Sequence, residues 1–237
     1  TFTSVNGQPR RRIARLLSDG GLDPDFAPEI GATSSPDAAT SIRAIASLPD
    51  GKILMGGSFT SVGGVPLTHL ARLNVNGTLD TSFAATLNST VLALAIQPDR
   101  RILVVGEFTT VNGVARNYLA RLLPDGALDT TFNPAPDNSV IALALQPDGK
   151  ILTLGTFTRM GGRDGWGIAR LHADGTADPT FRGVASGPYL RGLALQSDGK
   201  ILVYGGWMAL HAVACDGIGR LMPDGLMDPE FQNGIIS

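Results

Sequence analysis

Short apolar runs of four to six residues, separated by turn signals, occur along the whole chain. Three of them follow one another at residues 91–96, 102–105 and 119–123. They are rich in β-branched residues and too short for stable amphipathic helices, so they predict strands. Gly and Pro recur between the runs and mark turns, and we expect no helix.

Two kinds of turn link the predicted strands. Pro-Asp-Gly-Lys, at residues 49–52 and 147–150, supplies a fixed φ, a side-chain hydrogen bond to the backbone and a glycine for positive φ. It predicts a tight hairpin between a first and a second strand. A second turn, with Asp-Gly or Asn-Gly, links the third strand to a shorter fourth one. Its copies occupy residues 18–20, 75–77, 124–126, 173–175 and 223–225.

The whole pattern repeats about every 49 residues, as in an array of one supersecondary unit. The motif Ala-Arg-Leu, with Gly for Ala in the last copy, places arginines at Arg15, Arg72, Arg121, Arg170 and Arg220. Their first spacing is 57 residues because residues 27–40 lengthen one connection. We interpret this segment, rich in Ala, Ser, Thr and Pro, as a surface loop.

We therefore expect an all-β fold, a β-propeller of four-stranded antiparallel blades, with an open stack of hairpins as the alternative. Four complete blades follow a partial first one. Numbered in order as units 1 to 5, they span residues 1–26, 41–83, 90–132, 139–181 and 188–231. Because the sequence starts in mid-unit, we expect residues 1–237 to be a single propeller or a propeller segment of a longer chain.

Composition narrows the classes of partner and site. A net charge of −2 argues against nucleic acid, and no run of 18 apolar residues predicts a membrane span. The single cysteine, Cys215, excludes an internal disulfide and a cysteine metal cluster. The three histidines are not equivalent in the repeat, and the Asp-Gly turns offer too few oxygen ligands for calcium. We expect no metal and no cofactor.

One string carries a family resemblance: LQPDGKIL, then G-x-F-T-x-V-N-G, then A-R-L and D-G-x-L-D-x-x-F. It resembles the delta-60 repeat, a bacterial β-propeller repeat in a domain of unknown function. The resemblance runs from Phe2 to Phe231. It implies a propeller carried on secreted or surface-attached bacterial proteins. It brings no established catalytic residues.

An aspartate follows each recurring arginine by eight residues. Antiparallel third and fourth strands would bring the two side by side, so we predict a bidentate ion pair that clamps the outer strand of each blade. The pairs are Arg15 with Asp23, Arg72 with Asp80, Arg121 with Asp129, Arg170 with Asp178, and Arg220 with Asp228. The alternative is a ring of arginines that lines a channel and binds carboxylate or phosphate.

Four aromatic residues depart from the repeat in the last two units and are candidate binding residues, with blade packing as the alternative. They are Trp166, Tyr189, Tyr204 and Trp207. No Gly-x-Ser-x-Gly elbow or other catalytic constellation occurs, so we expect that the chain is not an enzyme.

The favoured function is a non-catalytic extracellular interaction or structural module, as a component of a surface assembly or fibre. Its partner would be a protein, a polysaccharide or further copies of itself. The alternative is a carbohydrate-binding or hydrolytic propeller with a pocket at the mouth of the central channel.

Overall fold

The computed structural model describes residues 2–31 and 40–231. Over these residues the regular secondary structure is entirely β, as the short apolar runs predict. Within the same ranges there is no helix long and apolar enough to cross a membrane.

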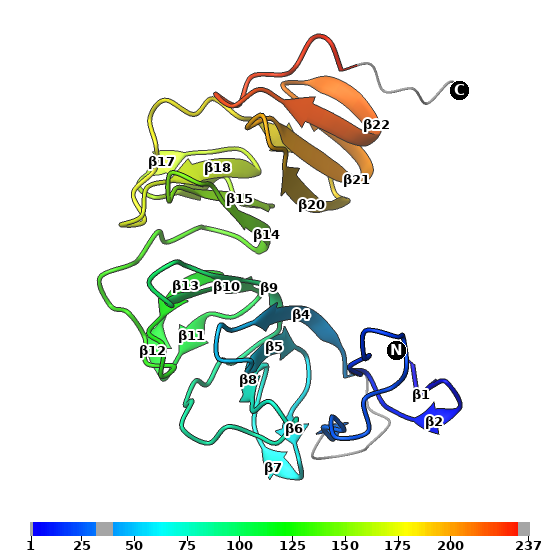
Figure 1. The fold of residues 1–237 in the computed structure, drawn as a ribbon. Coiled ribbons are helices and arrows are strands. Elements are labelled where there is room, and N and C mark those ends of the chain that lie inside the picture. The colour runs from blue at the N-terminus through cyan, green and yellow to red at the C-terminus, as the bar shows by residue number, and fades with distance from the viewer. Residues whose placement is uncertain (1, 32–39, 232–237) are drawn as a thin grey trace.

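Units 2 to 5 each contain a three-stranded antiparallel meander (Figure 1). In units 2 and 3 the strands are β4 (Ile42–Ser47), β5 (Ile53–Gly57) and β8 (Leu70–Leu73), then β9 (Val91–Ile96), β10 (Ile102–Gly106) and β13 (Leu119–Leu122). In units 4 and 5 they are β14 (Val140–Leu145), β15 (Ile151–Gly155) and β18 (Ile168–Leu171), then β20 (Leu190–Leu195), β21 (Ile201–Leu210) and β22 (Val213–Leu221). The second strand is always central, paired with the first and the third.

A small hairpin, which the sequence analysis does not predict, lies between the second and third strands. Its copies are β1 (Ser4–Val5) with β2 (Gln8–Pro9), β6 (Ser61–Val62) with β7 (Val65–Pro66), β11 (Thr110–Val111) with β12 (Val114–Ala115), and β16 (Arg159–Met160) with β17 (Arg163–Asp164). In unit 5 it merges into the long β21 and β22. Two further short strands, β3 (Ile30–Gly31) and β19 (Ala185–Ser186), pair with β6 and β21.

The predicted fourth strand is reduced to one bridge, so the expected four-stranded blade is wrong in this respect. In unit 3 the bridge joins Leu122 to Leu128. The next residue, Asp129, accepts a hydrogen bond from the backbone N–H of Thr131 through its side chain. This local turn draws the chain away from the sheet before a ladder can extend.

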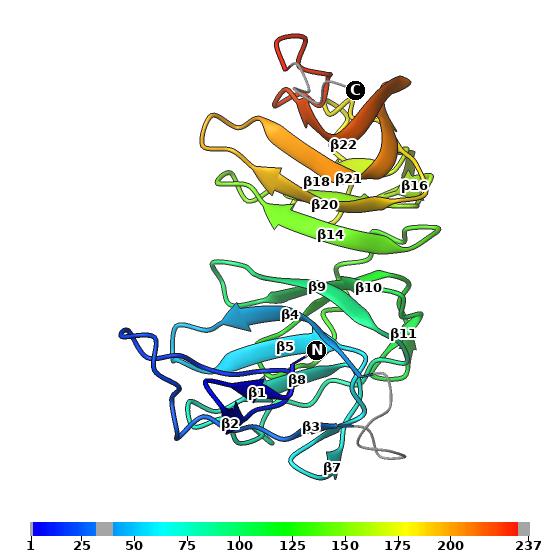
Figure 2. The same ribbon diagram turned by 90° about the vertical axis from the view of Figure 1, so that its right-hand side faces the viewer.

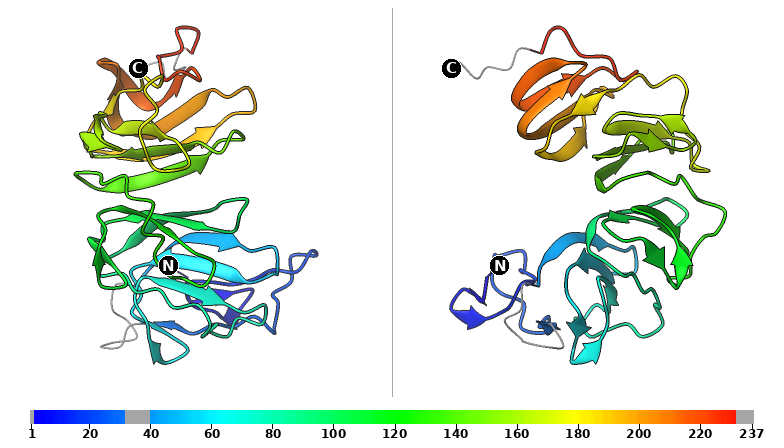
Figure 3. Two further views of the ribbon diagram at one scale, coloured as in Figure 1. Left: turned by 90° about the vertical axis from the view of Figure 1, so that its left-hand side faces the viewer. Right: turned by 180° about the vertical axis from the view of Figure 1, so that it is seen from behind.

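The sheets follow one another along an arc, with β1 and β2 at one end and β22 at the other (Figures 1 and 3). The first strands of the meanders, β4, β9, β14 and β20, succeed one another on the inner side (Figure 2). Apolar clusters fill the space between successive sheets. One of them joins Leu103 and Val105 of β10 to Ile151 of β15 and Leu171 of β18, all fully buried. Each unit thus depends on its neighbour for its core.

Candidate functional site

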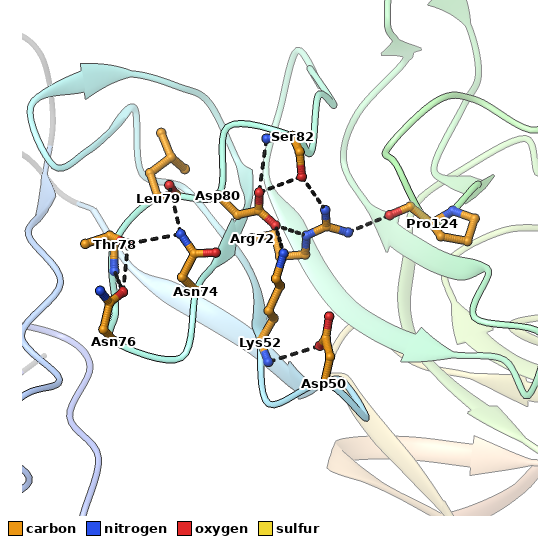
Figure 4. Close-up of polar contacts among 10 residues, drawn as sticks. All are labelled: Asp50, Lys52, Arg72, Asn74, Asn76, Thr78, Leu79, Asp80, Ser82 and Pro124. Atoms are coloured by element: carbon orange, nitrogen blue, oxygen red, sulfur yellow. Dashed lines mark hydrogen bonds and ion pairs between the residues drawn. The ribbon is translucent and has the colours of Figure 1, made fainter.

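The recurring arginine makes three different hydrogen bonds, which are all present at Arg72 (Figure 4). Its Nε donates to Oδ2 of Asp80 at 2.7 Å, and its Nη2 donates to Oγ of Ser82 at 3.1 Å. Its Nη1 donates to the backbone carbonyl of Pro124 at 2.6 Å. Asp80 belongs to the same unit as Arg72, whereas Pro124 lies in the Asp-Gly turn of the next one. One guanidinium therefore joins two successive units.

This arrangement recurs along the array. All five arginines pair with the aspartate eight residues later, with Nε–Oδ2 distances of 2.7 to 2.8 Å. The arginines of units 1 to 4 also donate from Nη1 to a carbonyl in the turn of the following unit, at 2.5 to 2.6 Å. The acceptors are the carbonyls of Val75, Pro124, Ala173 and Pro223. We call each set of arginine, aspartate and acceptor carbonyl an arginine junction.

An aromatic ring covers each guanidinium. The Cζ atom of the arginine lies 4.5 to 4.9 Å from the ring centroid of the phenylalanine eleven residues later, a distance typical of a cation–π contact. The rings are those of Phe26, Phe83, Phe132, Phe181 and Phe231. The guanidinium edge is thus left for hydrogen bonds while its face is shielded from water.

The turn that receives the arginine also packs closely against the preceding unit. In unit 3, Gly126 has a φ of 95°, and a Cβ there would lie 2.8 Å from the carbonyl oxygen of Ala84. The backbone N–H of Ala84 in turn donates to the carbonyl of Asp125 at 3.0 Å. Glycine is required here both by the positive φ and by this close approach.

The aspartates of the junctions are ionised at neutral pH. Burial raises the pKa of Asp129, but hydrogen bonds from the Thr131 hydroxyl and from Arg121 outweigh it and hold the pKa below its usual range. The pKa of each equivalent aspartate is lowered as well. Each arginine and aspartate therefore form an ion pair, and the pairs of Arg121 and Arg170 are almost fully shielded from water.

A second cation reaches four of these carboxylates from the hairpin turn between the first and second strands. The Nζ atoms of Lys52, Lys150 and Lys200 lie 2.7, 3.1 and 3.0 Å from Oδ2 of the aspartate of their own unit. In unit 3 Arg101 takes this position at 3.5 Å from Asp129. The carboxylate therefore ties two turns of one unit together.

The structure brings together every predicted arginine–aspartate pair, with one difference in geometry. The expected bidentate contact is absent from the pairs of the described residues, because only Nε donates to the carboxylate and Nη1 is directed to the next unit. In units 2 to 5 the arginines lie on β8, β13, β18 and β22, the strands farthest from the inner strands. They do not form the alternative ring along a channel.

Three of the four candidate aromatic residues lie exposed at the surface. Trp166, in the loop before β18, is 58% exposed, and Tyr189 and Tyr204 of unit 5 are 59% and 45% exposed. The side chain of Trp207 lies outside the part of the chain that the structure describes. Cys215 is buried. Within residues 2–31 and 40–231 no three His, Cys, Asp or Glu side chains gather as metal ligands would.

Besides the hydroxyl groups that accept from Nη2 of Arg72 and Arg170, sequence reasoning missed two partners of the arginine that recur along the array. The contact with phenylalanine could have been predicted, because a phenylalanine follows the arginine by eleven residues in every unit. The acceptor carbonyl could not have been predicted, because every residue type has a backbone carbonyl. In addition, the acceptor of Arg121 lies 52 residues away in the sequence.

A family model described as "Domain of unknown function (DUF5122) beta-propeller" matches residues 1–26, 48–83, 97–132, 146–181 and 196–231. The chain belongs to this family. The resemblance to a bacterial propeller repeat of unknown function, inferred from the repeated motif, is thereby confirmed. A comparison with curated proteins gives no match.

The solved structures that share the fold of this DUF5122 chain include two lyases. Virginiamycin B lyase from Staphylococcus aureus is 20% identical, with a TM-score of 0.50 over 79% of this chain and 54% of that one. A streptogramin B lyase is 21% identical, with a TM-score of 0.50 over 86% of this chain and 58% of that one. The chain thus spans less than two thirds of the length of either structure.

These structures correct one expectation. The sequence analysis expects that the chain is not an enzyme because no catalytic constellation is visible, and this expectation is wrong as an argument from sequence, since the same fold occurs in lyases. The repeated residues build the fold of such a propeller. They do not determine whether it catalyses a reaction, because catalysis depends on the residues of a particular site.

Proposed function

We propose that this chain is a scaffold module of a bacterial surface or secreted assembly, whose units present loops for contact with other macromolecules. The observation that carries the proposal is the arginine junction, which recurs at four successive unit boundaries. The arginine that recurs in the repeat is used to join units to one another. Such an array is suited to hold surface loops in fixed relative positions.

The residues that differ between units supply the proposed contacts. Trp166 and Tyr189 are more than half exposed, and neither has an aromatic counterpart at the same position of the other units. Exposed Trp and Tyr are typical of interfaces, because they offer a large apolar surface with a polar tip. With a net charge of −2, the chain fits a protein or polysaccharide partner better than a nucleic acid. The location outside the cell rests on the resemblance of the repeat.

The location is tested in cells that produce the protein. Protease added to intact cells should remove it, while a cytoplasmic marker protein stays intact. Survival of the chain until the cells are lysed would contradict the proposal. Chemical cross-linking on the intact cells, followed by identification of the attached molecules, would then name the partner.

A polysaccharide is the second candidate partner, favoured by the surroundings of Trp166. Its exposed ring borders a groove of about 210 Å³ to which Arg163 and Asp164 contribute charged groups. Trp166→Ala should abolish binding to a glycan array, whereas Tyr189→Ala, on the neighbouring unit, should leave it unchanged. Equal binding by both variants and the unaltered chain would exclude this groove.

A further inference from the structure

Three side chains of unit 4 that depart from the repeat border one groove, the groove of about 210 Å³ beside Trp166. Arg163 belongs to β17, Trp166 lies in the loop before β18, and Arg182 follows the phenylalanine that closes the unit. No other unit has the same residue type at any of these three positions, and valine replaces Arg163 in units 2, 3 and 5. Because three separate departures from the repeat meet in one groove, we treat the groove as a specific site of unit 4.

Backbone hydrogen bonds fix the segment between β17 and β18, and β17 lies on the outer side of the arc (Figure 1). The N–H of Gly167 donates to the carbonyl of Phe157 at 3.0 Å. The carbonyl of Trp166 accepts from the N–H of Ala185 at 2.8 Å. Gly167 has a φ of 71°, and a Cβ there would overlap the carbonyl oxygen of Ala185. The side chain of Trp166 is still 58% exposed, so the chain presents an aromatic ring from a preformed backbone.

Two cations at the groove have no acidic partner. The two acids that border the groove, Asp164 and Asp178, are already paired with other arginines, at 3.5 and 2.8 Å. Arg163 and Arg182 are exposed, and neither makes an ion pair within residues 2–31 and 40–231. Their guanidinium groups are therefore available to an anion.

We infer that this groove binds an acidic polysaccharide, with the ring of a uronic acid residue stacked on Trp166 and carboxylates bound by Arg163 and Arg182. The C–H face of a pyranose ring is apolar and complements the face of an exposed indole. The planar guanidinium complements a carboxylate, with which it can form two parallel hydrogen bonds. A uronic acid carries both groups in one rigid residue.

The inference rests on the second candidate partner of the proposed function, a polysaccharide at this groove, and names its chemical class. An acidic peptide complements the groove less well. Its carboxylates stand on flexible side chains, which lose more conformational entropy on binding, and they have no ring beside them to stack on the indole.

The test compares polymers that differ in one property. Isothermal titration calorimetry of the unaltered 237-residue chain should detect binding of polygalacturonate or alginate, which are both built from uronic acids. Fully methyl-esterified polygalacturonate keeps the rings and lacks the charge, whereas poly-L-glutamate keeps the charge and lacks the rings. Each of these two should bind at least about tenfold more weakly.

Variants of the groove locate the binding. Trp166→Ala should raise the dissociation constant for the uronic acid polymer by more than about tenfold, and Arg163→Gln and Arg182→Gln should each raise it by about tenfold. The matched control is Arg100→Gln, which removes the same charge from an exposed arginine in a turn of unit 3. It should leave the dissociation constant within about twofold, since distant surface charges are screened. Thermal melts that match the unaltered chain show that the variants fold.

Three outcomes overturn the inference. The first is absence of binding to both uronic acid polymers, or an equal loss in the control and in the groove variants. The second is binding of poly-L-glutamate as tight as that of the polysaccharides, which would indicate an acidic peptide as the partner. The third is full affinity for the esterified polymer that Trp166→Ala abolishes, which would leave a neutral polysaccharide at this groove. The protease test on intact cells judges the proposed location separately.

Discussion

At the scale of single residues, arginine is suited to the junction because its guanidinium is planar and presents donors in several fixed directions. In Arg121 the Nε bonds the carboxylate of Asp129, the Nη1 bonds the carbonyl of Ala173, and the flat face covers Phe132. A lysine could offer the charge but not these directions at once. This explains why lysine appears in the repeat only as the second cation near the carboxylate, at Lys52, Lys150 and Lys200.

Arg121→Ala should lower the free energy of unfolding by about 3 kcal/mol, since it leaves the carboxylate of Asp129 buried without its arginine partner. The matched control is Arg101→Ala, which removes a half-exposed cation 3.5 Å from the same carboxylate. That loss should stay below about 1 kcal/mol. Urea titrations of both variants measure the difference. Similar losses of unfolding free energy in the two variants would show that the arginine junction stabilises the fold no more than a surface ion pair does.

At the scale of secondary-structure elements, the sequence predicts what depends on neighbouring residues. The strand expected at 91–96 is β9 itself, and the one expected at 119–123 differs from β13 by one residue. The hairpin β11–β12 was missed although Asn112-Gly113 marks it, because two-residue strands give no periodicity to read. The Arg–Asp pairs follow from spacing within one unit. Their link to the next unit does not, because it depends on how separate sheets pack.

The turn between β21 and β22 of unit 5, which is equivalent to the turn of the small hairpins in the other units, gives a prediction at this scale. The two central residues of this turn have positive φ in every unit, with Asn112 at 50° and Gly113 at 77° in unit 3. In unit 5 they are His211 at 48° and Ala212 at 62°. The Nε2 atom of His211 contacts the carbonyl of Gly225 at 2.9 Å, as the side-chain amide of Asn112 does with Gly126. Histidine thus replaces the asparagine contact, whereas Ala212 has the backbone strain without any such contact.

Ala212→Gly should therefore raise the free energy of unfolding by about 1 kcal/mol, because glycine adopts this φ without a steric cost from Cβ. Gly113→Ala, at the equivalent position of unit 3, is the reciprocal change and should lower it by a similar amount. Thermal melts of the two variants measure both effects. A destabilised Ala212→Gly protein would show that the methyl group packs usefully and that strain is unimportant there.

At the scale of the whole molecule, stability is shared between units and the junctions that connect them. The apolar clusters and the arginine junctions both span unit boundaries, so neither can form within one isolated unit. The carboxylates that pair with the arginines are chemically alike in all five units. A change of conditions that acts on one junction therefore acts on all of them together.

Acid is such a condition, and the sign of its effect follows from the lowered pKa values. A carboxyl group whose pKa is lower in the folded chain than in the unfolded one stabilises the fold above the unfolded pKa, and this stability is lost as the pH falls. The carboxylate contribution to the unfolding free energy should therefore be constant from pH 7 to about 5 and fall steeply below about 4.

His69 acts in the same direction from a higher pH. Burial lowers the pKa of its imidazole, so protonation favours the unfolded chain and costs stability as the pH drops below about 6.5. His69→Asn removes this contribution, and asparagine tolerates the φ of 67° at this position. Urea titrations from pH 7 to 3 on this variant should then show a single decline, below about pH 4. If this variant kept its full stability at pH 3, the five ion pairs would contribute nothing to the free energy of unfolding.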